Sequence, residues 1–419
     1  MRRPSKTRTP KLSADSQRLG ALAQAMVQAS SRFEERGWER QLDLLIRKLL
    51  KTDHQGTVDA ALDYLFTAEN GAYDALMESV EAVSSSCVIE HDGKPHDALL
   101  IAMPIMAWTR FSIASGQISS DMLATLSAHL YAHILASGTI AVMAPTLYAI
   151  DQLPRTHYET AQLTQRLAQA AVNNIVLKPP LNAPETAPFL ADTRYLLAVV
   201  VTPSEGPIFQ WQTSDVPLDV TVRQQQVLAQ WQAQAQPNIE RLLPGCGVQL
   251  LLPEAYFVAC READKQIRPV SIHAAVNYLT HALETTASEL SAIIGGFGEE
   301  LHDDVEEYRI SFALRGQPDV LYGIVWPLYG QEENDGEVPE AGLRLVAQTG
   351  TDDPAVLTPM EEILAMLRES GVTDVTHHDE HFALEFCEDC GTPLFCDREA
   401  ELVHAEMPEN TPQATGHLH

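Results

Sequence analysis

The sequence predicts an α/β protein, with mixed α+β as the alternative, that begins with a helical segment and ends in a cysteine-containing β-hairpin. Three observations support this prediction. Apolar residues recur at helical spacing over residues 12–96. From residue 97 onward, apolar strand-like runs alternate with helix-like segments. Near the carboxyl end, three of the six cysteines fall within ten residues of each other.

The N-terminal segment is predicted to be helical because its apolar residues form stripes along one helix face. The clearest stripe consists of Leu42, Leu45, Ile46, Leu49 and Leu50. Two further helices are expected to begin at about Thr57 and about Tyr73. Residues 1–11, ahead of these helices, are expected to form a disordered basic tail.

The remainder of the chain divides into three segments that look like variants of one strand–helix–strand unit. We assign these units to residues 97–178, 189–292 and 293–408. Each has an apolar run, then a helix that ends near a glycine, and then a second apolar run. The predicted helices cover residues 120–137, 221–243 and 359–369, with further helices near 157–173 and 271–290. We interpret this order as a divergent internal repeat of two or three units, although any α/β protein shows some such alternation.

Several segments between these elements are predicted to be loops. The proline-rich residues 178–188 and the acidic residues 330–342 are typical of extended or mobile linkers. The glycine-rich residues 293–300 are interpreted as a turn before a strand, because they lack the lysine and hydroxyl residue of a phosphate-binding loop. Residues 409–419 are expected to form a disordered tail.

The charge of the chain restricts its partners and its location. The net charge is −29, and residues 1–11 hold five positive and no negative side chains, so the remainder carries −34. An acidic body repels phosphate, which argues against general nucleic-acid binding by that body. No apolar run reaches the about 18–20 residues of a membrane helix, and the basic start lacks the apolar core of a secretory signal. We therefore expect a cytoplasmic protein with reduced cysteines and no membrane association.

The cysteine-rich stretch contains the one local pattern with a recognisable chemistry. Cys387 and Cys390 are followed by a glycine, and their spacing lets two thiolates face the same metal ion. Cys396 and His404 are the best residues to complete a tetrahedral set, so the pattern predicts a structural zinc site in a hairpin. If either of them is absent from the site, the substitutes are His377, His378 and His381.

Redox chemistry and three ordinary thiols are the alternatives to a metal site. A redox thiolate is usually stabilised by a helix N-terminus, whereas Cys390 leads into residues 391–395, which read as a turn and a strand. The residues between the two thiols are Glu388 and Asp389. Nearby anions raise the pKa of a thiol, whereas a bound dication offsets them. Both arguments favour a metal over redox chemistry.

A second candidate site is the polar segment 260–269. Arg261, Asp264 and Arg268 follow a predicted strand, and Asp151 occupies the corresponding place in the first unit. Because α/β proteins place ligands beyond the carboxyl ends of strands, these residues could line a pocket for a small cationic or mixed-charge ligand. The alternative is structural, since Asp264 and Arg268 are four residues apart and would stabilise a helix.

Several stretches of the chain resemble a known family. They are "KLSADSQRLGALA", "SSRFEERGWERQLDLLIRKLL", "ACREADKQIRPVSIHAAVNYL", "EFCEDCGTPLF" and "VHAEMPE". Through them, nearly the full chain resembles a family of uncharacterised bacterial proteins known only as a domain of unknown function. The resemblance implies a soluble bacterial protein of conserved architecture and brings no activity. It also implies a closing pattern of Cys-x2-Cys and a later histidine, which Cys387, Cys390 and His404 match and which does not require Cys396.

These observations lead to ranked hypotheses about function. The first is a cytoplasmic, non-enzymatic binding or assembly protein with a structural zinc knuckle and an unknown protein partner or small ligand. The second is an enzyme or ligand-binding protein with the polar pocket around residues 261–268. The third is a regulatory module that reads a partner through the basic tail at residues 1–11.

Overall fold

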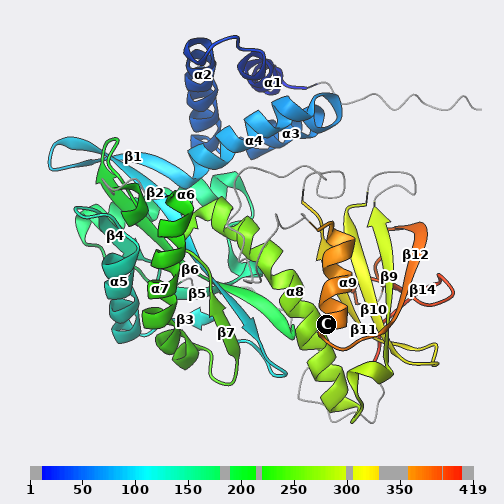
Figure 1. Ribbon diagram of the computed structural model, residues 1–419. Coiled ribbons are helices and arrows are strands. Elements are labelled where there is room, and N and C mark those ends of the chain that lie inside the picture. The colour runs from blue at the N-terminus through cyan, green and yellow to red at the C-terminus, as the bar shows by residue number, and fades with distance from the viewer. Residues whose placement is uncertain are drawn as a thin grey trace, which may run out of the picture.

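The computed structural model describes residues 12–179, 189–213, 219–298, 305–329, 357–388 and 390–407. Its fold class is the predicted one, because a helical N-terminus is followed by mixed helices and strands that form two larger sheets and a small hairpin (Figure 1). The tails predicted at 1–11 and 409–419 and the acidic loop predicted at 330–342 lie outside the described residues, as does nearly all of the proline-rich linker. Within the described ranges, no helix combines the length and apolar character that a bilayer crossing requires.

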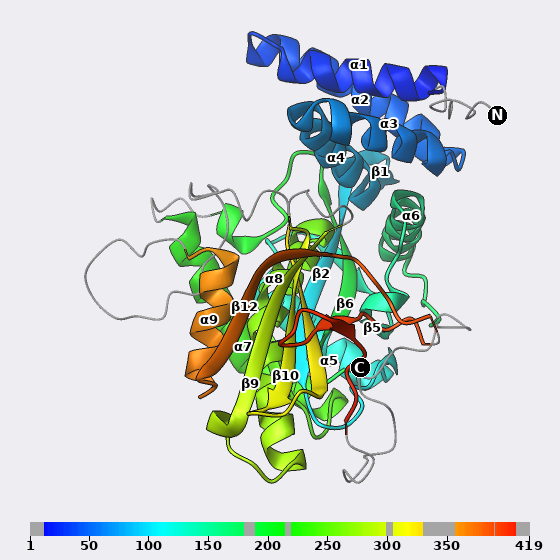
Figure 2. The same ribbon diagram turned by 90° about the vertical axis from the view of Figure 1, so that its right-hand side faces the viewer.

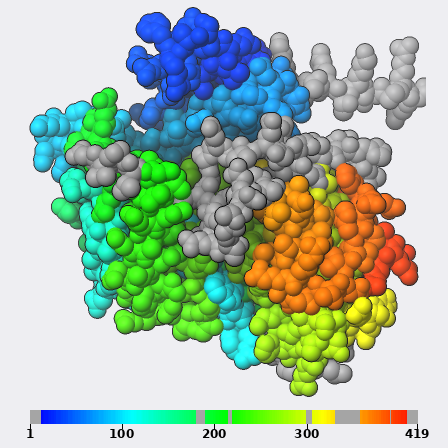
Figure 3. Space-filling view, in the orientation of Figure 1, coloured from blue at the N-terminus to red at the C-terminus, as the bar shows by residue number. Residues whose placement is uncertain are grey.

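Four helices form the N-terminal bundle. They are α1 (Ala14–Val27), α2 (Arg32–Lys51), α3 (Gln55–Ala68) and α4 (Asn70–Ser85). The side chains of Ser13 and Ser31 cap the first two by accepting backbone hydrogen bonds, and the predicted leucine stripe of α2 faces the bundle's apolar centre. The bundle forms a separate lobe at one end of the molecule (Figure 3).

A β-hairpin connects this bundle to the first sheet. Its first strand and its turn lie within residues 12–96, which were predicted to be helical. α4 runs directly into β1 (Ser86–His91), which pairs antiparallel with β2 (Lys94–Trp108). The two residues between the strands, Asp92 and Gly93, both have positive φ angles, as the tightest hairpin turns require. The strand part of the chain therefore begins at residue 86 rather than at 97.

The first sheet is built around the long antiparallel pair of β2 and β6 (Ala191–Pro203). The shorter strands are β3 (Gly116–Gln117), β4 (Ile140–Met143), β5 (Thr146–Ala149), β7 (Gly247–Leu250) and β8 (Glu254–Ala255). The helices are α5 (Ser120–His133), α6 (His157–Asn173), α7 (Val220–Leu242) and α8 (Tyr256–Ala282), with single turns η1 (Ile150–Gln152), η2 (Gln210–Gln212) and η3 (Ala287–Glu289). α5 and α7 cover one face of the sheet, and α6 and the first half of α8 cover the other.

The same order of elements occurs twice around this sheet. Apart from the two-residue strand β3 and the single turns, a long strand, a helix, two short strands and a second helix follow each other from β2 to α6 and again from β6 to α8. The short strands are exchanged, since β4 and β5 pair with β6 whereas β7 and β8 pair with β2. This reciprocal pairing agrees with a duplicated unit, and the repeat itself stays a prediction.

The second sheet has the order β11-β10-β9-β12. Its strands are β9 (Leu290–Gly298), β10 (Glu307–Leu314), β11 (Val320–Pro327) and β12 (Asp374–Ala383), and only β12 runs parallel to its neighbour. The second half of α8 and α9 (Pro359–Glu369) cover one face. A small hairpin of β13 (Phe395–Cys396) and β14 (Leu402–Val403) lies on the other face (Figure 2).

The interpretation of residues 293–300 as a turn was wrong for the described residues 293–298, which belong to the buried strand β9. Their glycines allow close approach rather than a change of direction. A Cβ atom on Gly295 would lie 2.8 Å from the Sγ of Cys396, and one on Gly296 would lie 2.9 Å from a methyl carbon of Val305. These neighbouring glycines therefore make room on opposite faces of the sheet.

α8 also differs from the prediction, because it starts at Tyr256 and includes the whole polar segment 260–269. Pro269 lies inside this helix, although proline cannot donate a hydrogen bond to the carbonyl four residues earlier. In the structure, Nε of Arg268 donates to that carbonyl, on Lys265, over 3.3 Å. The helix therefore continues through the proline and spans both sheets (Figure 1).

Candidate metal centre

A tight loop places the two cysteines of the Cys-x2-Cys pattern side by side. The loop is closed at its base by hydrogen bonds from Cys387 N to Thr392 O and from Leu394 N to Glu385 O, of 2.8 and 3.0 Å. Within it, the N–H of Gly391 donates to the carbonyl of Cys387 over 2.8 Å, and the φ angle of Gly391 is +73°. This φ angle lies in the left-handed region, which favours glycine, so the turn predicted at Gly391 is present.

The small hairpin brings His404 to the same place. After β13, the carboxylate of Asp397 accepts hydrogen bonds from the N–H groups of Glu399 and Glu401, both of 2.9 Å. This turn reverses the chain into β14, and His404 follows directly. The hairpin predicted from sequence is thus formed, although its paired strands are only two residues long.

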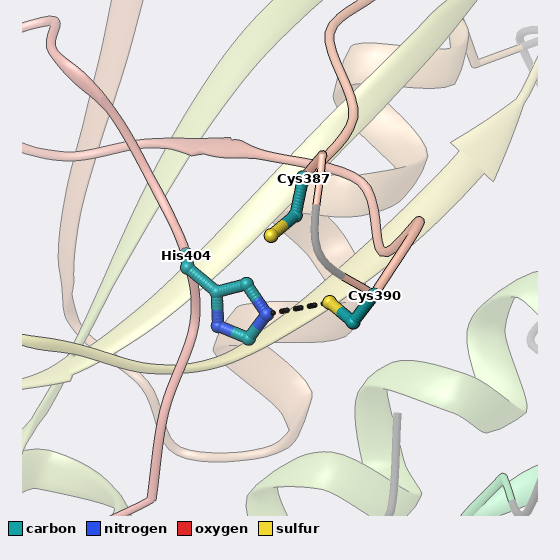
Figure 4. A group of neighbouring side chains, drawn as sticks. All are labelled: Cys387, Cys390 and His404. Carbon is teal, nitrogen blue, oxygen red and sulfur yellow. Dashed lines mark hydrogen bonds between the residues drawn. The ribbon is translucent and has the colours of Figure 1, made fainter.

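Cys387, Cys390 and His404 form a group whose ligand atoms all lie within 4.8 Å of one another (Figure 4). The Sγ of Cys390 lies 3.2 Å from Nε2 of His404 and 3.1 Å from the hydroxyl oxygen of Thr392. Hydrogen bonds from the Thr392 side chain and backbone, and then from His404, lower the pKa of the Cys390 thiol to about 6. The thiolate, which is the form that binds metals, is therefore favoured at neutral pH.

The imidazole of His404 is oriented as a metal ligand requires. Its Nε2 faces the two sulfur atoms, whereas its Nδ1 is buried and forms no hydrogen bond within the described part of the chain. A carboxylate oxygen of Glu406 lies 3.4 Å from this Nδ1. Metal-bound histidines commonly donate their second N–H to a carboxylate, so Glu406 is placed to become that acceptor.

Cys396 does not belong to this group, which corrects the four-ligand set proposed from the sequence. It is fully buried among Ile293, Phe297, Ala313 and Phe382. Burial raises the pKa of its thiol to about 11. The spacing of Cys396 from Cys390 suits a zinc ligand. In β13, however, the side chain of Cys396 points toward the sheet, where it packs as a small apolar residue.

The upstream histidines do not take its place. They lie on β12, where Nε2 of His378 is 2.7 Å from the carbonyl oxygen of Asp397 and His377 is 3.8 Å from Asp379. His378 therefore supports the turn of the hairpin instead of the metal group. Among the residues that the structure places, the group comprises three possible ligands.

A buried arginine holds the cysteine loop against the sheet. Nη1 of Arg309 donates to the carbonyls of Glu385 and Leu394, over 2.8 and 2.5 Å, which are the two ends of the loop. Its Nε donates to Glu307 over 2.6 Å, and its guanidinium lies 4.2 Å from the ring centre of Phe297. Ser311, on the same face of β10, donates to the carbonyl of Cys396 over 2.6 Å. The polar residues of β10 thus bind the backbone of the hairpin.

Comparisons with known proteins agree with the resemblance noted in the sequence. The family described as "Protein of unknown function (DUF2863)" matches residues 4–418. The chain belongs to this family. No curated protein and no solved structure matches it. Membership in DUF2863 therefore brings no activity, and the chemistry of the site has to be argued from its residues.

The residues of the second candidate site in this DUF2863 member do not line either of the two cavities described beside α8. Arg261 donates to Glu81 of α4 at 2.5 and 2.7 Å, so it links α8 to the bundle. Arg268 is buried, donates to the carbonyl of Pro327 over 2.8 Å and lies 5.1 Å from the ring centre of Trp326. Both arginines thus join α8 to other elements. Burial raises the pKa of Asp264 whereas the charge of Arg268 lowers it, which agrees with the helix pair given as the structural alternative.

The two acidic residues of that candidate site are engaged separately. Asp264 accepts a long hydrogen bond of 3.5 Å from Tyr195, and burial raises its pKa to about 6. Asp151 lies in η1, where its charge adds to the burial that raises the pKa of Asp192. The cavity of about 680 Å³ beside α8 is lined by other residues, including Trp108, His273 and Tyr278.

Sequence reasoning missed the residues that support the metal group. Thr392, Glu406 and Arg309 indicate a metal site far less clearly than a cysteine pair does, because threonine, glutamate and arginine occur throughout any chain. Thr392 and Glu406 could have been found by their position two residues after Cys390 and after His404. Arg309 had a signal too, since an arginine in the middle of an apolar strand needs buried partners.

Proposed function

We propose that this DUF2863 member binds one zinc ion through Cys387, Cys390 and His404, and that it is a non-enzymatic binding or assembly protein of the cytoplasm. The observation that carries the proposal is the convergence of two thiols and one imidazole, from two separate loops, within 4.8 Å. In this role the ion would join the cysteine loop to the end of β14. The hairpin has only two paired residues in each strand, so it needs such a link.

The donor set supports zinc over other common ions. Two thiolates and one imidazole suit a borderline-soft ion, whereas magnesium and calcium prefer oxygen ligands. All six cysteines are free thiols, so Cys387 and Cys390 are both available as metal ligands. The acidic side chain of Glu388 next to the site adds favourable charge for a dication.

Elemental analysis of the purified protein tests this proposal. We expect about one zinc per chain, the number that a single group of ligands can hold. Cys390→Ser should lose the metal. Cys396→Ser is the matched control, since it changes a thiol of the same hairpin and should keep the metal. Metal-free native protein with unchanged stability would contradict the structural role.

A catalytic metal is the second candidate, and one observation favours it. Three protein ligands leave a coordination position for water or a substrate, and Cys390 is exposed. Replacement of zinc by cobalt separates the two roles. If the absorption spectrum of the cobalt protein is unchanged by added imidazole or azide, the site is closed and structural. A spectral shift would support an exchangeable position and hence an enzyme.

The other partners proposed from the sequence need a direct search. The polar pocket around Arg261 and Asp264 gains no support, because each residue has a structural partner. An unknown protein partner is better sought by affinity capture from native cells with the zinc-loaded protein. Comparison with the Cys390→Ser protein would reveal which partners depend on the metal centre.

A further inference from the structure

The exposed face of α2 carries a continuous row of cationic and apolar side chains. Phe33, Arg36, Arg40, Leu44, Arg47 and Lys51 follow each other at steps of three or four residues. Such steps place all six on one face of a helix. We call this row the α2 stripe. All six side chains are exposed, and the opposite face of α2 holds the buried leucines of the bundle.

The stripe is unusual because the chain as a whole is strongly acidic. Residues 1–51 hold 12 of the 28 lysines and arginines but only 5 of the 57 acidic residues, which gives +7 against −36 for the remainder. The four cations of the stripe form no ion pair within the described residues. Asp43 flanks Arg47, and Lys48 beside the stripe lies 3.9 Å from Asp15. The cations are therefore available to an external anion.

The apolar members of the stripe are also largely uncovered by the described part of the chain. Phe33 is 89% exposed and Leu44 is 69% exposed. Arg36 and Arg40 lie between them. A face that alternates exposed cations with an exposed ring is typical of surfaces that track a phosphate backbone while bases stack on aromatic side chains.

The dimensions of the stripe favour a nucleic-acid strand over a protein partner. The 19 residues from Phe33 to Lys51 span about 27 Å at a rise of 1.5 Å per residue, and a helix face is about 10 Å wide. The resulting area of about 300 Å² is well below the roughly 800 Å² per partner of a stable protein interface. Phosphate contacts need no such area, because each cation that neutralises a phosphate releases counterions.

We propose that the α2 stripe binds single-stranded nucleic acid without sequence preference. Arg36, Arg40, Arg47 and Lys51 contact phosphates, and Phe33 stacks on a base. The acidic sheets do not prevent this, because the bundle projects from them and charges more than about 10 Å away are screened at 0.1 M salt (Figures 1 and 3). The bundle itself, residues 12–85, holds 7 lysines and arginines and 12 acidic residues, and seven of those acidic residues lie in residues 52–85, outside α2. Binding is confined to this lobe, so it differs from general binding by the body.

Fluorescence anisotropy of labelled strands tests the proposal with the full-length protein. The probes are an oligouridine and an oligothymidine of about 20 nucleotides, which cover the site sizes of known single-strand binders. Four phosphate contacts predict a slope of about −2.8 for the logarithm of the association constant against that of salt. Affinity should therefore fall about 50-fold between 50 and 200 mM salt. Equal binding of the two probes indicates backbone recognition, and preference for the RNA indicates contacts to its hydroxyl groups.

A charge-matched pair of variants separates the stripe from the overall charge. The triple change Arg36→Gln, Arg40→Gln and Arg47→Gln should weaken binding at least tenfold and make the slope shallower by about 2. The control changes three exposed cations of the body, Lys94→Gln, Arg155→Gln and Arg241→Gln. This control alters the net charge equally and should leave both quantities within about twofold. Equal losses in the two triple variants would overturn the proposal.

Two further measurements complete the test. Phe33→Ala should weaken binding to both strands about fivefold or more, and an unchanged affinity would contradict the stacking contact. Polyglutamate and vesicles with anionic lipid are the competing partners. If either binds as tightly as the strands and depends equally on the stripe, the partner is an acidic protein or a membrane and the proposal fails. Absence of binding to both strands at about 20 mM salt would also refute it.

Discussion

The contact between Gly323 and Phe395 offers a way to test whether the metal centre depends on the sheet beneath it. A Cβ atom added to Gly323 of β11 would lie 2.2 to 2.5 Å from three ring atoms of Phe395. Phe395 is buried in β13 and cannot swing into solvent without moving the hairpin. We predict that Gly323→Ala lifts the hairpin from the sheet and weakens zinc binding.

The size of the effect follows from the cost of overpacking. Forcing an extra methyl group into a packed site costs about 1–3 kcal/mol. If the whole cost falls on docking of the hairpin, zinc binding weakens by about 5- to 150-fold, since a factor of ten corresponds to about 1.4 kcal/mol. The hairpin carries His404, so loss of its position removes one of three ligands.

Competition with a chromophoric zinc chelator measures this change. The matched control is Gly296→Ala on β9, where the added atom would lie 2.9 Å from Val305 on the opposite face of the sheet. Both variants should lower the thermal midpoint, but only Gly323→Ala should lower the zinc affinity. The reasoning is refuted if both variants bind zinc equally well, or if Gly323→Ala binds zinc as tightly as the native protein.

Three further predictions concern buried side chains. Burial raises the pKa of Glu254 to about 7. Ionisation of Glu254 is therefore easier in the unfolded chain, and the free energy of unfolding of the protein falls as the pH rises from about 4.5 through 7. Glu254→Gln should therefore gain about 2–3 kcal/mol over the native protein at pH 8 and almost nothing at pH 4.5, as urea denaturation at both values would show. Arg309→Met should cost about 3 kcal/mol, because it leaves the Glu307 carboxylate without its buried partner, and it should weaken zinc binding in the chelator assay. Cys396→Ala should keep its zinc in elemental analysis, and its loss of stability should stay near 1 kcal/mol because only one buried sulfur is removed.

Local patterns in the sequence predicted most of the helices closely, with α8 as the exception. α9 was expected at 359–369 and has those bounds, because Thr358 and Glu361 form a capping box that marks its start. The cysteine loop was equally predictable, since Gly391 must adopt a left-handed conformation for the chain to turn. In both cases the determining contacts lie within a few residues of each other.

Features set by distant contacts were missed. The glycines of β9 were interpreted as a turn, whereas they make room for the side chains of Cys396, far along the chain, and of Val305, just before β10. Cys396 was counted as a ligand because its spacing from Cys390 was suitable, yet the pleat of β13 directs it into the core. The helix predicted near residues 271–290 begins already at Tyr256 and continues through Pro269, where the side chain of Arg268 replaces the missing hydrogen bond.

The continuous helix α8 makes one cooperative unit of what its sequence suggests are separable parts. Its first half packs Tyr256, Ala259 and Ala263 against the first sheet, and its second half packs Ile272 and other residues against the second sheet. Unfolding of either half of α8 would expose the apolar core of one sheet to water and would shorten the helix that packs on the other sheet. The two sheets should therefore unfold in a single calorimetric transition, because neither keeps an intact core after the loss of its neighbour.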